Sequence, residues 1–387
     1  MKKIKKLLSL VTAASLAFAM ASCAGSGQSA STPAAPASSA AGSEAASESA
    51  APAGEKLKLV VCVGWINDLS FYQSTYEGSQ RVLKELGDKY DVEVVEMGTD
   101  NAVWPDAFYD AADNGADIVV TVGYQNKEAF ETIPKEYPDT KFILFDQEID
   151  YSSGGLDNVL SVVFDANGAG FLSGAAAGYY TTSEQGNPDK KIGFVGAYDS
   201  ATINNFLVGY AEGARYVDPE IEVSTAYIGG FADTAKAKDL AKAQIDGGAD
   251  VMFQVAGGAG NGVFEAVTEN GGVAIGVDSD QFVTLNGTGL EGCIMTSCLK
   301  EVGNALFKIC SDYVADPASV PFGQNISYGL EQQAVGIVYN DNLTKYLGEE
   351  KVAKVKELQD KIAKGEITVS SATGLSSDEI KKIVAGK

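Results

Sequence analysis

The chain has 387 residues, a hydrophobic content of 45% and a formal net charge of −23. The length allows two domains, and the negative charge argues against nucleic acid as a partner, because phosphate binding needs a basic face. Histidine is absent from the sequence, which excludes imidazole metal sites and any catalytic scheme with a histidine base.

The N-terminal segment has the pattern of an export signal. Lysines crowd its first six residues, and the apolar stretch 7–20 that follows is too short for a comfortable membrane span. The tetrapeptide "MASC" at 20–23 resembles the bacterial lipobox, whose cysteine carries diacylglycerol. We therefore expect a signal peptide at 1–22 and a lipid anchor at Cys23 that holds the protein to the extracytoplasmic face of the cell membrane. A cleaved signal with an incidental cysteine is the alternative.

A linker and a folded body follow. Residues 23–54 consist almost wholly of Ala, Ser, Gly, Pro and Glu, so they cannot bury a core and are predicted to be a disordered tether. From Leu57 the chain alternates β-rich runs with amphipathic stretches. This alternation predicts an α/β fold of two Rossmann-like lobes, each with a parallel sheet covered by helices.

The predicted elements follow in chain order. Strands are expected at 57–64, 91–98, 117–123, 141–146, 158–164, 190–197, 221–227, 250–255, 273–277 and the start of 292–314. Helices are expected at 70–87, 105–114, 127–136, 167–182, 203–215, 233–246, 261–270, the rest of 292–314, and 341–364. The predicted domains are 55–170 with 300–325 returning to it, 171–299 with part of 326–340, and a C-terminal helix and tail at 341–387.

One phrase occurs twice. "NGADIVVTVGY" at 114–124 is matched by "GGADVMFQVAG" at 247–257, and each is followed by a second apolar run that ends in an aspartate, Asp146 or Asp278. We interpret this as a repeated βαβ unit. Ligands of open parallel sheets bind outside the carboxyl ends of the strands, so we expect both aspartates to point into one cleft shared by the lobes.

Polar and aromatic residues gather at the turns predicted to face this cleft. Such a set would suit a flat heterocycle, because aromatic faces stack on it and carboxylates, amides and a lysine bond its edges or a sugar. Taken singly, the aspartates and serine could instead be helix caps, and the phenylalanines could be core. The candidates are Trp65, Asn67, Asp68, Ser70, Phe71, Tyr72, Gln73, Asp146, Gln147, Phe231, Gly257, Gly258, Asp278 and Lys300.

The remaining motifs favour neither metal nor cofactor. The five cysteines show no CxxC spacing, so we expect buried thiols, with a Cys293–Cys298 bridge as the alternative. The glycine-rich stretch 258–262 has Val263 where a dinucleotide fingerprint needs its third glycine.

Several stretches then resemble a known family. "INDLSFYQSTYEG", "GGFADTAKAKDLAKAQIDGGADVMFQVAGGAGNGVFEAV", "AIGVDSDQ" and "TSCLK" are similar to the BMP family, the PnrA-like purine-nucleoside receptors of ABC importers. The resemblance runs from about Leu57 to Ile367. It implies a type I periplasmic-binding-protein fold that closes about a hinge, and delivery of a nucleoside to a membrane permease with its ATPase.

The resemblance also implies residue roles and shows two departures. Phe71 and Phe231 correspond to the aromatic pair that sandwiches the base, Asp146 to the carboxylate at the base edge, and Asp278, Lys300 and the Gly257 region to ribose ligands. The family usually reads S-F-N-Q where this chain has Tyr72 as the third residue, and it often has an aspartate near Cys62. We expect altered polar contacts there.

The sequence thus predicts a lipid-anchored, monomeric binding protein for a nucleoside, with purine as the preferred base, and no enzyme. Another small solute, such as a sugar or a modified heterocycle, and a sensory receptor remain alternatives. An enzyme would need a nucleophile with a partnered base, and the sequence shows none.

Overall fold

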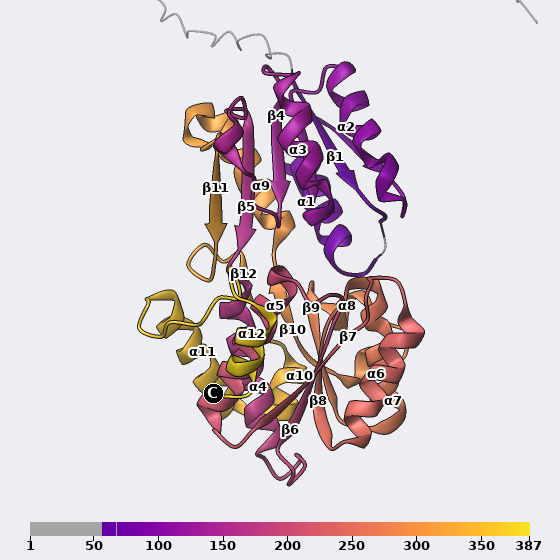
Figure 1. Cartoon of the computed structure of the whole chain (residues 1–387), viewed down its shortest axis with the longest axis vertical. Coiled ribbons are helices and arrows are strands. Elements are labelled where there is room, and N and C mark those ends of the chain that lie inside the picture. Colours follow the sequence, from indigo (N-terminus) through magenta and orange to yellow (C-terminus); the bar gives the residue numbers. More distant parts are fainter. Residues whose placement is uncertain (1–55, 67) are drawn as a thin grey trace, which may run out of the picture. The chain divides into compact units, whose positions relative to one another are not determined.

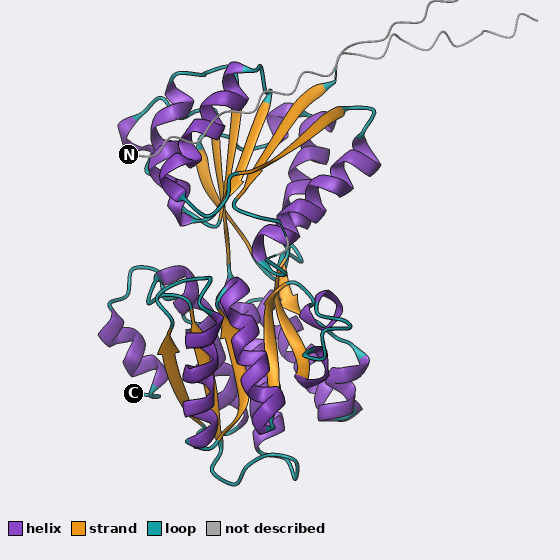
Figure 2. Ribbon diagram, turned by 90° about the vertical axis from the view of Figure 1, so that its right-hand side faces the viewer, coloured by secondary structure: helices purple, strands orange, loops and turns teal. Residues whose placement is uncertain are grey.

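The structure is a computed structural model that describes residues 56–66 and 68–387. The predicted signal peptide, the Cys23 anchor, the linker and Asn67 lie outside the described residues. The described residues belong to one compact unit, built on two sheets (Figures 1 and 2).

The strands fall into two sheets with the same order. The first sheet reads β11-β5-β4-β3-β1-β2, and the second reads β12-β10-β9-β8-β6-β7. The first contains β1 (Leu57–Val63), β2 (Tyr90–Glu96), β3 (Ile118–Val122), β4 (Lys141–Phe145), β5 (Val159–Phe164) and β11 (Gln324–Tyr328). The second contains β6 (Lys191–Gly196), β7 (Glu222–Tyr227), β8 (Ala249–Val255), β9 (Val273–Asp278), β10 (Ile294–Lys300) and β12 (Val335–Ile337).

Helices connect the strands and cover the sheets (Figure 2). They are α1 (Phe71–Leu86), α2 (Trp104–Asp113), α3 (Lys127–Thr132), α4 (Ala166–Thr181), α5 (Ala201–Val217), α6 (Thr234–Asp246), α7 (Asn261–Asn270), α8 (Gln281–Thr284), α9 (Val302–Ala315), α10 (Asp341–Leu347), α11 (Glu349–Ala363) and α12 (Ser377–Val384). We call each sheet with its covering helices a lobe. The predicted α/β fold with two lobes is confirmed.

The repeated phrase forms equivalent parts of the two sheets. β3, α3 and β4 are its first copy, and β8, α7 and β9 are its second. β3 pairs in parallel with β4, and β8 pairs in parallel with β9. The predicted βαβ repeat is therefore confirmed, and each copy ends at the aspartate that the sequence singled out.

Burial on both faces explains the continuous apolar runs of the central strands. In β1, Val61 joins the core cluster that contains Val82 of α1. The next residue, Cys62, points the other way and joins the cluster that contains Phe108 of α2. Since successive side chains of a strand alternate between faces, both must be apolar.

The chain passes between the lobes at three places. It leaves the first sheet after β5, returns to it in α9, which packs on α1, and crosses again between β11 and β12. The crossing segments bond to one another, because Asp165 N donates to Tyr328 O at 2.9 Å and Glu301 N donates to Ala334 O at 2.8 Å. These hydrogen bonds join the segments that connect the two lobes.

The helix predicted at 167–182 is rich in small residues and packs closely on its neighbour. α4 lies against α5, and Gly209 and Gly213 of α5 meet the backbone carbonyls of Asn167 and Phe171 of α4. A Cβ atom at either glycine would fall well inside van der Waals contact with backbone. The absence of a side chain at these two glycines therefore allows α4 and α5 to pack closely.

The C-terminal region differs from the prediction. The single helix expected at 341–364 is divided into α10 and α11 at Gly348, whose φ of 78° interrupts a helix. The tail contains α12, which begins with a capping box between Ser376 and Glu379 and buries Ile380. The helix was missed although the sequence carries its signals, namely the capping-box spacing and an apolar period.

The cysteines of the described region are free and buried: Cys62, Cys293, Cys298 and Cys310. The buried-thiol expectation is confirmed for them, and the Cys293–Cys298 bridge is not formed.

Candidate functional site

A cavity of about 390 Å³ lies between the lobes, at the carboxyl ends of strands from both sheets. All the predicted site residues of the described region line it, except Ser70, Gln73 and Gln147. The predicted residues that line it are Trp65, Asp68, Phe71, Tyr72, Asp146, Phe231, Gly257, Gly258, Asp278 and Lys300.

Three charged residues form the centre of the site. The Lys300 ammonium lies 2.8 Å from a carboxylate oxygen of Asp146, which follows β4 in the first lobe. It lies 3.6 Å from a carboxylate oxygen of Asp278, the last residue of β9 in the second lobe. The side chain of Lys300 is only 5% exposed, so one buried cation joins carboxylates from both halves of the repeat.

Both aspartates have the same unusual backbone conformation. The φ angles are 68° at Asp146 and 65° at Asp278, in the left-handed region that non-glycine residues rarely adopt. Such strain persists where the surrounding structure enforces it, and it often accompanies function. The two copies of the repeat thus turn their aspartates toward the cavity in the same way.

Burial and charge shift the pKa values in this cluster in defined directions. Burial by itself would lower the pKa of Lys300, but the nearby carboxylates of Asp146 and Asp278 outweigh it and hold that pKa above the ordinary value. Burial raises the pKa of Asp146, and Lys300 opposes that rise. Lys300 therefore stays protonated at neutral pH and supplies the positive charge of the site.

Asp68 serves the structure and also borders the cavity. Its carboxylate accepts the backbone N–H groups of Ser70, Tyr72 and Gln73 at 2.9–3.0 Å, so it caps α1, as the helix-cap alternative proposed. Burial raises the pKa of Asp68 to about 6, against the effect of these hydrogen bonds and with a further rise from Asp278.

Three predicted residues lie outside the cavity wall: Ser70, Gln73 and Gln147. Ser70 is fully buried, and its hydroxyl donates to Asp278 at 2.8 Å across the lobes. Ser70 therefore acts as a bridge between the lobes and does not cap the helix with its side chain. The Gln73 amide donates to Glu77 on α1 at 2.8 Å.

A second bridge lies beside Ser70. The Leu69 carbonyl accepts hydrogen bonds from the Ser279 hydroxyl at 3.3 Å and from the Gln281 amide at 3.2 Å. The turn before α1 is thus attached to the turn after β9, and these hydrogen bonds join the two lobes beside the cavity.

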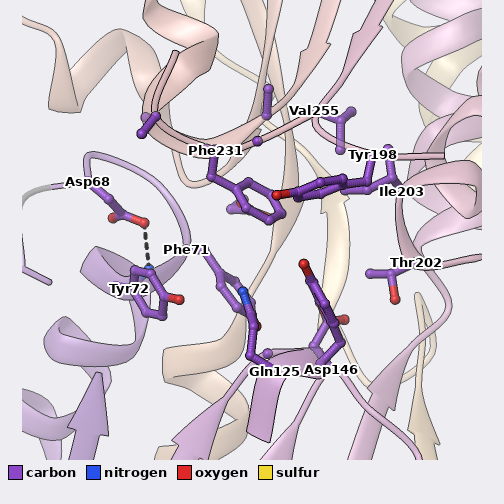
Figure 3. A pocket seen from close by; sticks show the side chains of 18 of the residues that line it. Asp68, Phe71, Tyr72, Gln125, Asp146, Tyr198, Thr202, Ile203, Phe231 and Val255 are labelled. Atoms are coloured by element: carbon purple, nitrogen blue, oxygen red, sulfur yellow. Dashed lines mark hydrogen bonds between the residues drawn. The ribbon is translucent and has the colours of Figure 1, made fainter. Parts of the chain in front are cut away.

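Aromatic rings border the cavity on both lobes. Figure 3 shows Phe231 and Tyr198 on one side of the space and Phe71 on the other. The Lys300 ammonium lies 4.4 Å from the centre of the Phe71 ring, a cation–π distance. Tyr198 contacts Phe231 at 5.5 Å between ring centres and Tyr124 of the first lobe at 6.3 Å.

The two positions that depart from the family pattern differ in their surroundings. Tyr72 packs with Trp65 at 5.0 Å and with Trp104 at 6.4 Å between ring centres, so its ring is part of an aromatic wall. Cys62 is fully buried in β1 and does not line the cavity. Only the Tyr72 departure therefore alters the lining itself.

Sequence reasoning missed several lining residues. Tyr124 and Gln125 follow β3, and Tyr198, Ser200 and Thr202 come from the turn after β6 and the start of α5. The repeat carried a usable signal for the first pair, because they follow β3 as Gly257 and Gly258 follow β8.

Metal ligation and membrane crossing find no support in the described residues. Within 56–66 and 68–387, no group of three or more His, Cys, Asp or Glu side chains is placed to hold a metal ion. None of the helices in that part of the chain has the length and hydrophobicity to span a membrane.

Comparison with known proteins gives consistent matches. Residues 56–373 match the Bmp family, described as ABC transporter substrate-binding protein PnrA-like. The chain is 32% identical over 329 residues to the ABC transporter nucleoside-binding protein BmpA of Lactococcus lactis, which covers 82% of this chain and 89% of that protein. It is 32% identical over 332 residues to the CD4+ T-cell-stimulating antigen of Listeria monocytogenes, with 80% and 87% covered.

Solved structures with the same fold include transport proteins. An ABC transporter solute-binding protein from Aeropyrum pernix superposes with a TM-score of 0.69 at 24% identity, covering 85% of this chain and 98% of that one. A second, from Conexibacter woesei, gives a TM-score of 0.65 at 21% identity and covers 82% and 99%. At these identities the likeness shows the fold.

Proposed function

Because the chain belongs to the PnrA-like family of ABC transporter substrate-binding proteins, which bind a small molecule and work with a permease, we propose that its cargo is a nucleoside with a purine base. The relative from Lactococcus lactis is named as a nucleoside-binding protein. The cavity of about 390 Å³ suits a ligand of that size, since small-molecule pockets span about 300–1,000 Å³.

The observation that carries this proposal is the pairing of a charged group with aromatic faces in one cavity. Lys300 and Asp278 offer a cation and a carboxylate to ribose hydroxyls, and Asp146 beside them offers a carboxylate to the edge of the base. Phe71 and Phe231 border the same cavity from opposite lobes and offer flat faces to a base. A nucleoside needs both kinds of surface at once.

Both lobes would contribute to the hold on the ligand. Asp146 and Phe71 belong to the first lobe, and Asp278 and Phe231 belong to the second. A ligand that touches both stabilises the closed arrangement by its differential affinity for it. We propose that this closed form delivers the nucleoside to the permease and its ATPase.

We also propose that the mature protein is tethered by lipid at Cys23 and works at the extracytoplasmic face of the cell membrane. Two acyl chains would anchor it stably. In a detergent phase-separation experiment, the full-length protein should partition with the detergent and the Cys23→Ser variant with water; equal partitioning would refute the anchor.

The cargo is tested by what travels with the protein. We expect natively purified protein, denatured and examined by mass spectrometry, to release a purine nucleoside in amounts close to one per chain. Recovery of a sugar or another ring compound at that stoichiometry would refute the proposal.

A further inference from the structure

Gln125 lies on a rigid turn at the edge of the cavity. It belongs to the short 3-10 helix η2 (Tyr124–Asn126) directly after β3. Asn126 is buried, and its amide donates to the Val122 carbonyl at 2.9 Å and to the Thr121 hydroxyl at 3.3 Å. These bonds fix the turn to the end of the strand, so the position of Gln125 is determined by the fold.

The side chain of Gln125 rests over Gly123. A Cβ atom at residue 123 would lie 2.6 Å from Gln125 Oε1 and 3.8 Å from a ring carbon of Phe71. Gly123 has a φ of 98°, which glycine adopts without strain. The glycine therefore provides both the bend of the turn and the space in which the Gln125 amide lies next to Phe71.

The two ends of this amide have different surroundings. Oε1 is enclosed by protein, and no residue of the described chain gives it a hydrogen bond. Figure 3 shows the nitrogen at the tip of the side chain, directed toward the space that separates Phe71 from Phe231. Rotating the amide would enclose an NH₂ group with two donors, and unpaired buried N–H groups are rarer than under-satisfied carbonyl oxygens.

We propose that Gln125 is a specificity-determining residue that donates an amide N–H to a carbonyl oxygen on the edge of the ring stacked against Phe71. The site would then prefer 6-oxopurine nucleosides to 6-aminopurine nucleosides, because an amino group at the same place would oppose one donor to another. This inference rests on the proposed function and specifies its substrate class.

The other polar groups near the ring complement this role. Asp68, Asp146 and Asp278 line the same cavity as acceptors, and Lys300 is engaged by two of them. Gln125 thus offers a neutral N–H donor beside Phe71, to the edge of the bound ring. The carboxylates are placed to accept N–H or O–H groups of the ligand. A ring that carries a carbonyl beside an N–H satisfies both kinds of partner.

The test is calorimetric titration of the purified protein with inosine, purine riboside and adenosine. Purine riboside lacks both the 6-oxo group and the N1–H of inosine, so the change in their affinity ratio between the unaltered protein and Gln125→Leu reports the proposed hydrogen bond. We expect inosine to bind the unaltered protein at least about tenfold more tightly than purine riboside or adenosine, because one net hydrogen bond accounts for about that factor. In Gln125→Leu, we expect the ratio of inosine to purine riboside to fall by about tenfold, and any preference that remains reports the ring N–H that the carboxylates accept.

Two controls separate this role from a general defect. Gln324→Leu makes the same change at an exposed position of β11 outside the cavity, and it should keep the tenfold ratio. The affinity ratio of inosine to 2′-deoxyinosine should be the same in Gln125→Leu as in the unaltered protein, because that ratio reports the ribose contacts.

Each result of these titrations either supports or contradicts the role of Gln125. A preference for inosine over purine riboside that persists undiminished in Gln125→Leu overturns the inference, and so does tighter binding of adenosine than of inosine by the unaltered protein; both leave the nucleoside function standing. If none of the three compounds binds the unaltered protein, the proposed function fails and this inference fails with it.

Discussion

The hydroxyl of Ser70 donates a hydrogen bond to the carboxylate of Asp278 at 2.8 Å, although the two residues are 208 positions apart and belong to different lobes. Both side chains are buried. Ser70 comes directly before α1, and Asp278 ends β9. The same carboxylate faces Lys300 at 3.6 Å, so the bond links the closure of the cleft to the charged centre of the site.

Ser70→Ala should weaken this link. The substitution leaves a buried carboxylate with one partner fewer, and we expect the free energy of unfolding to fall by about 1–3 kcal/mol. Urea unfolding measures the loss. Ser79→Ala is the matched control, because Ser79 is also buried on α1 but bonds only the Tyr76 carbonyl of its own helix. Equal losses in the two variants would show that the contact between the lobes contributes nothing of its own.

Removal of the central cation should cost more. Lys300→Met leaves Asp146 and Asp278 buried without a positive charge, and breaking a buried ion pair from one side costs about 3–5 kcal/mol. We expect a lower melting temperature at pH 7 that recovers in part as the pH falls, because burial raises the pKa of Asp146 and Lys300 no longer opposes this.

The double variant Lys300→Met/Asp146→Asn provides the check on that explanation. It removes the cation together with the closer carboxylate, so it should be more stable than Lys300→Met alone. A double variant that is less stable than the single one would contradict the assigned role of the charge pair.

The pH dependence of stability should carry a contribution from Asp68. Burial raises its pKa from the ordinary 3.8 to about 6 in the folded protein, so between these pH values the folded state binds more protons than the unfolded state. Stability from this group therefore decreases as the pH rises from about 4 to about 6, by on the order of 3 kcal/mol in total.

Asp68→Asn removes this titration. We expect the difference in unfolding free energy between the unaltered protein and the variant to change across pH 4–6 and to be constant above pH 7. Chemical denaturation at a series of pH values measures it. Parallel curves for the two proteins would mean that Asp68 has no raised pKa in the folded state.

The close packing of α4 on α5 predicts a severe effect of a single methyl group. Gly213→Ala would drive a Cβ atom into the backbone of Phe171, which cannot move aside as a flexible side chain would. We expect a loss of more than about 2 kcal/mol. Gly292→Ala, where a Cβ meets no atom within 4 Å, should change stability little, and similar losses in both variants would contradict the packing argument.

The repeated apolar runs made most of the fold predictable. Short strands that end in Asp146 and Asp278 follow directly from the two copies of the phrase, and parallel sheets place such strand ends on one edge. The lining positions of Phe71 and Lys300 followed from their place after β1 and at the end of β10. The positions of the strands along the sequence were enough to predict that these residues line the cavity, because the ends of the strands define the cleft.

Other features depend on contacts between distant segments. Ser70 was expected to face a ligand or cap a helix, and it instead bonds Asp278, a partner that no local pattern indicates. Tyr198 lines the cavity, where its ring contacts Phe231 and Tyr124, two residues that are distant from it in the sequence. α12 was missed although Ser376 and Glu379 have capping-box spacing and its apolar residues follow a helical period.

The most direct test of the account is calorimetric titration of purine nucleosides into the purified protein, its Phe231→Ala variant and its Asp278→Asn variant. If one cleft between the lobes grips base and ribose together, the unaltered protein binds a purine nucleoside saturably at one site. Each variant then binds it at least about tenfold more weakly, the result expected for the loss of one stacking or hydrogen-bonded contact. Binding that both variants retain in full, or no heat from any nucleoside with the unaltered protein, would contradict it.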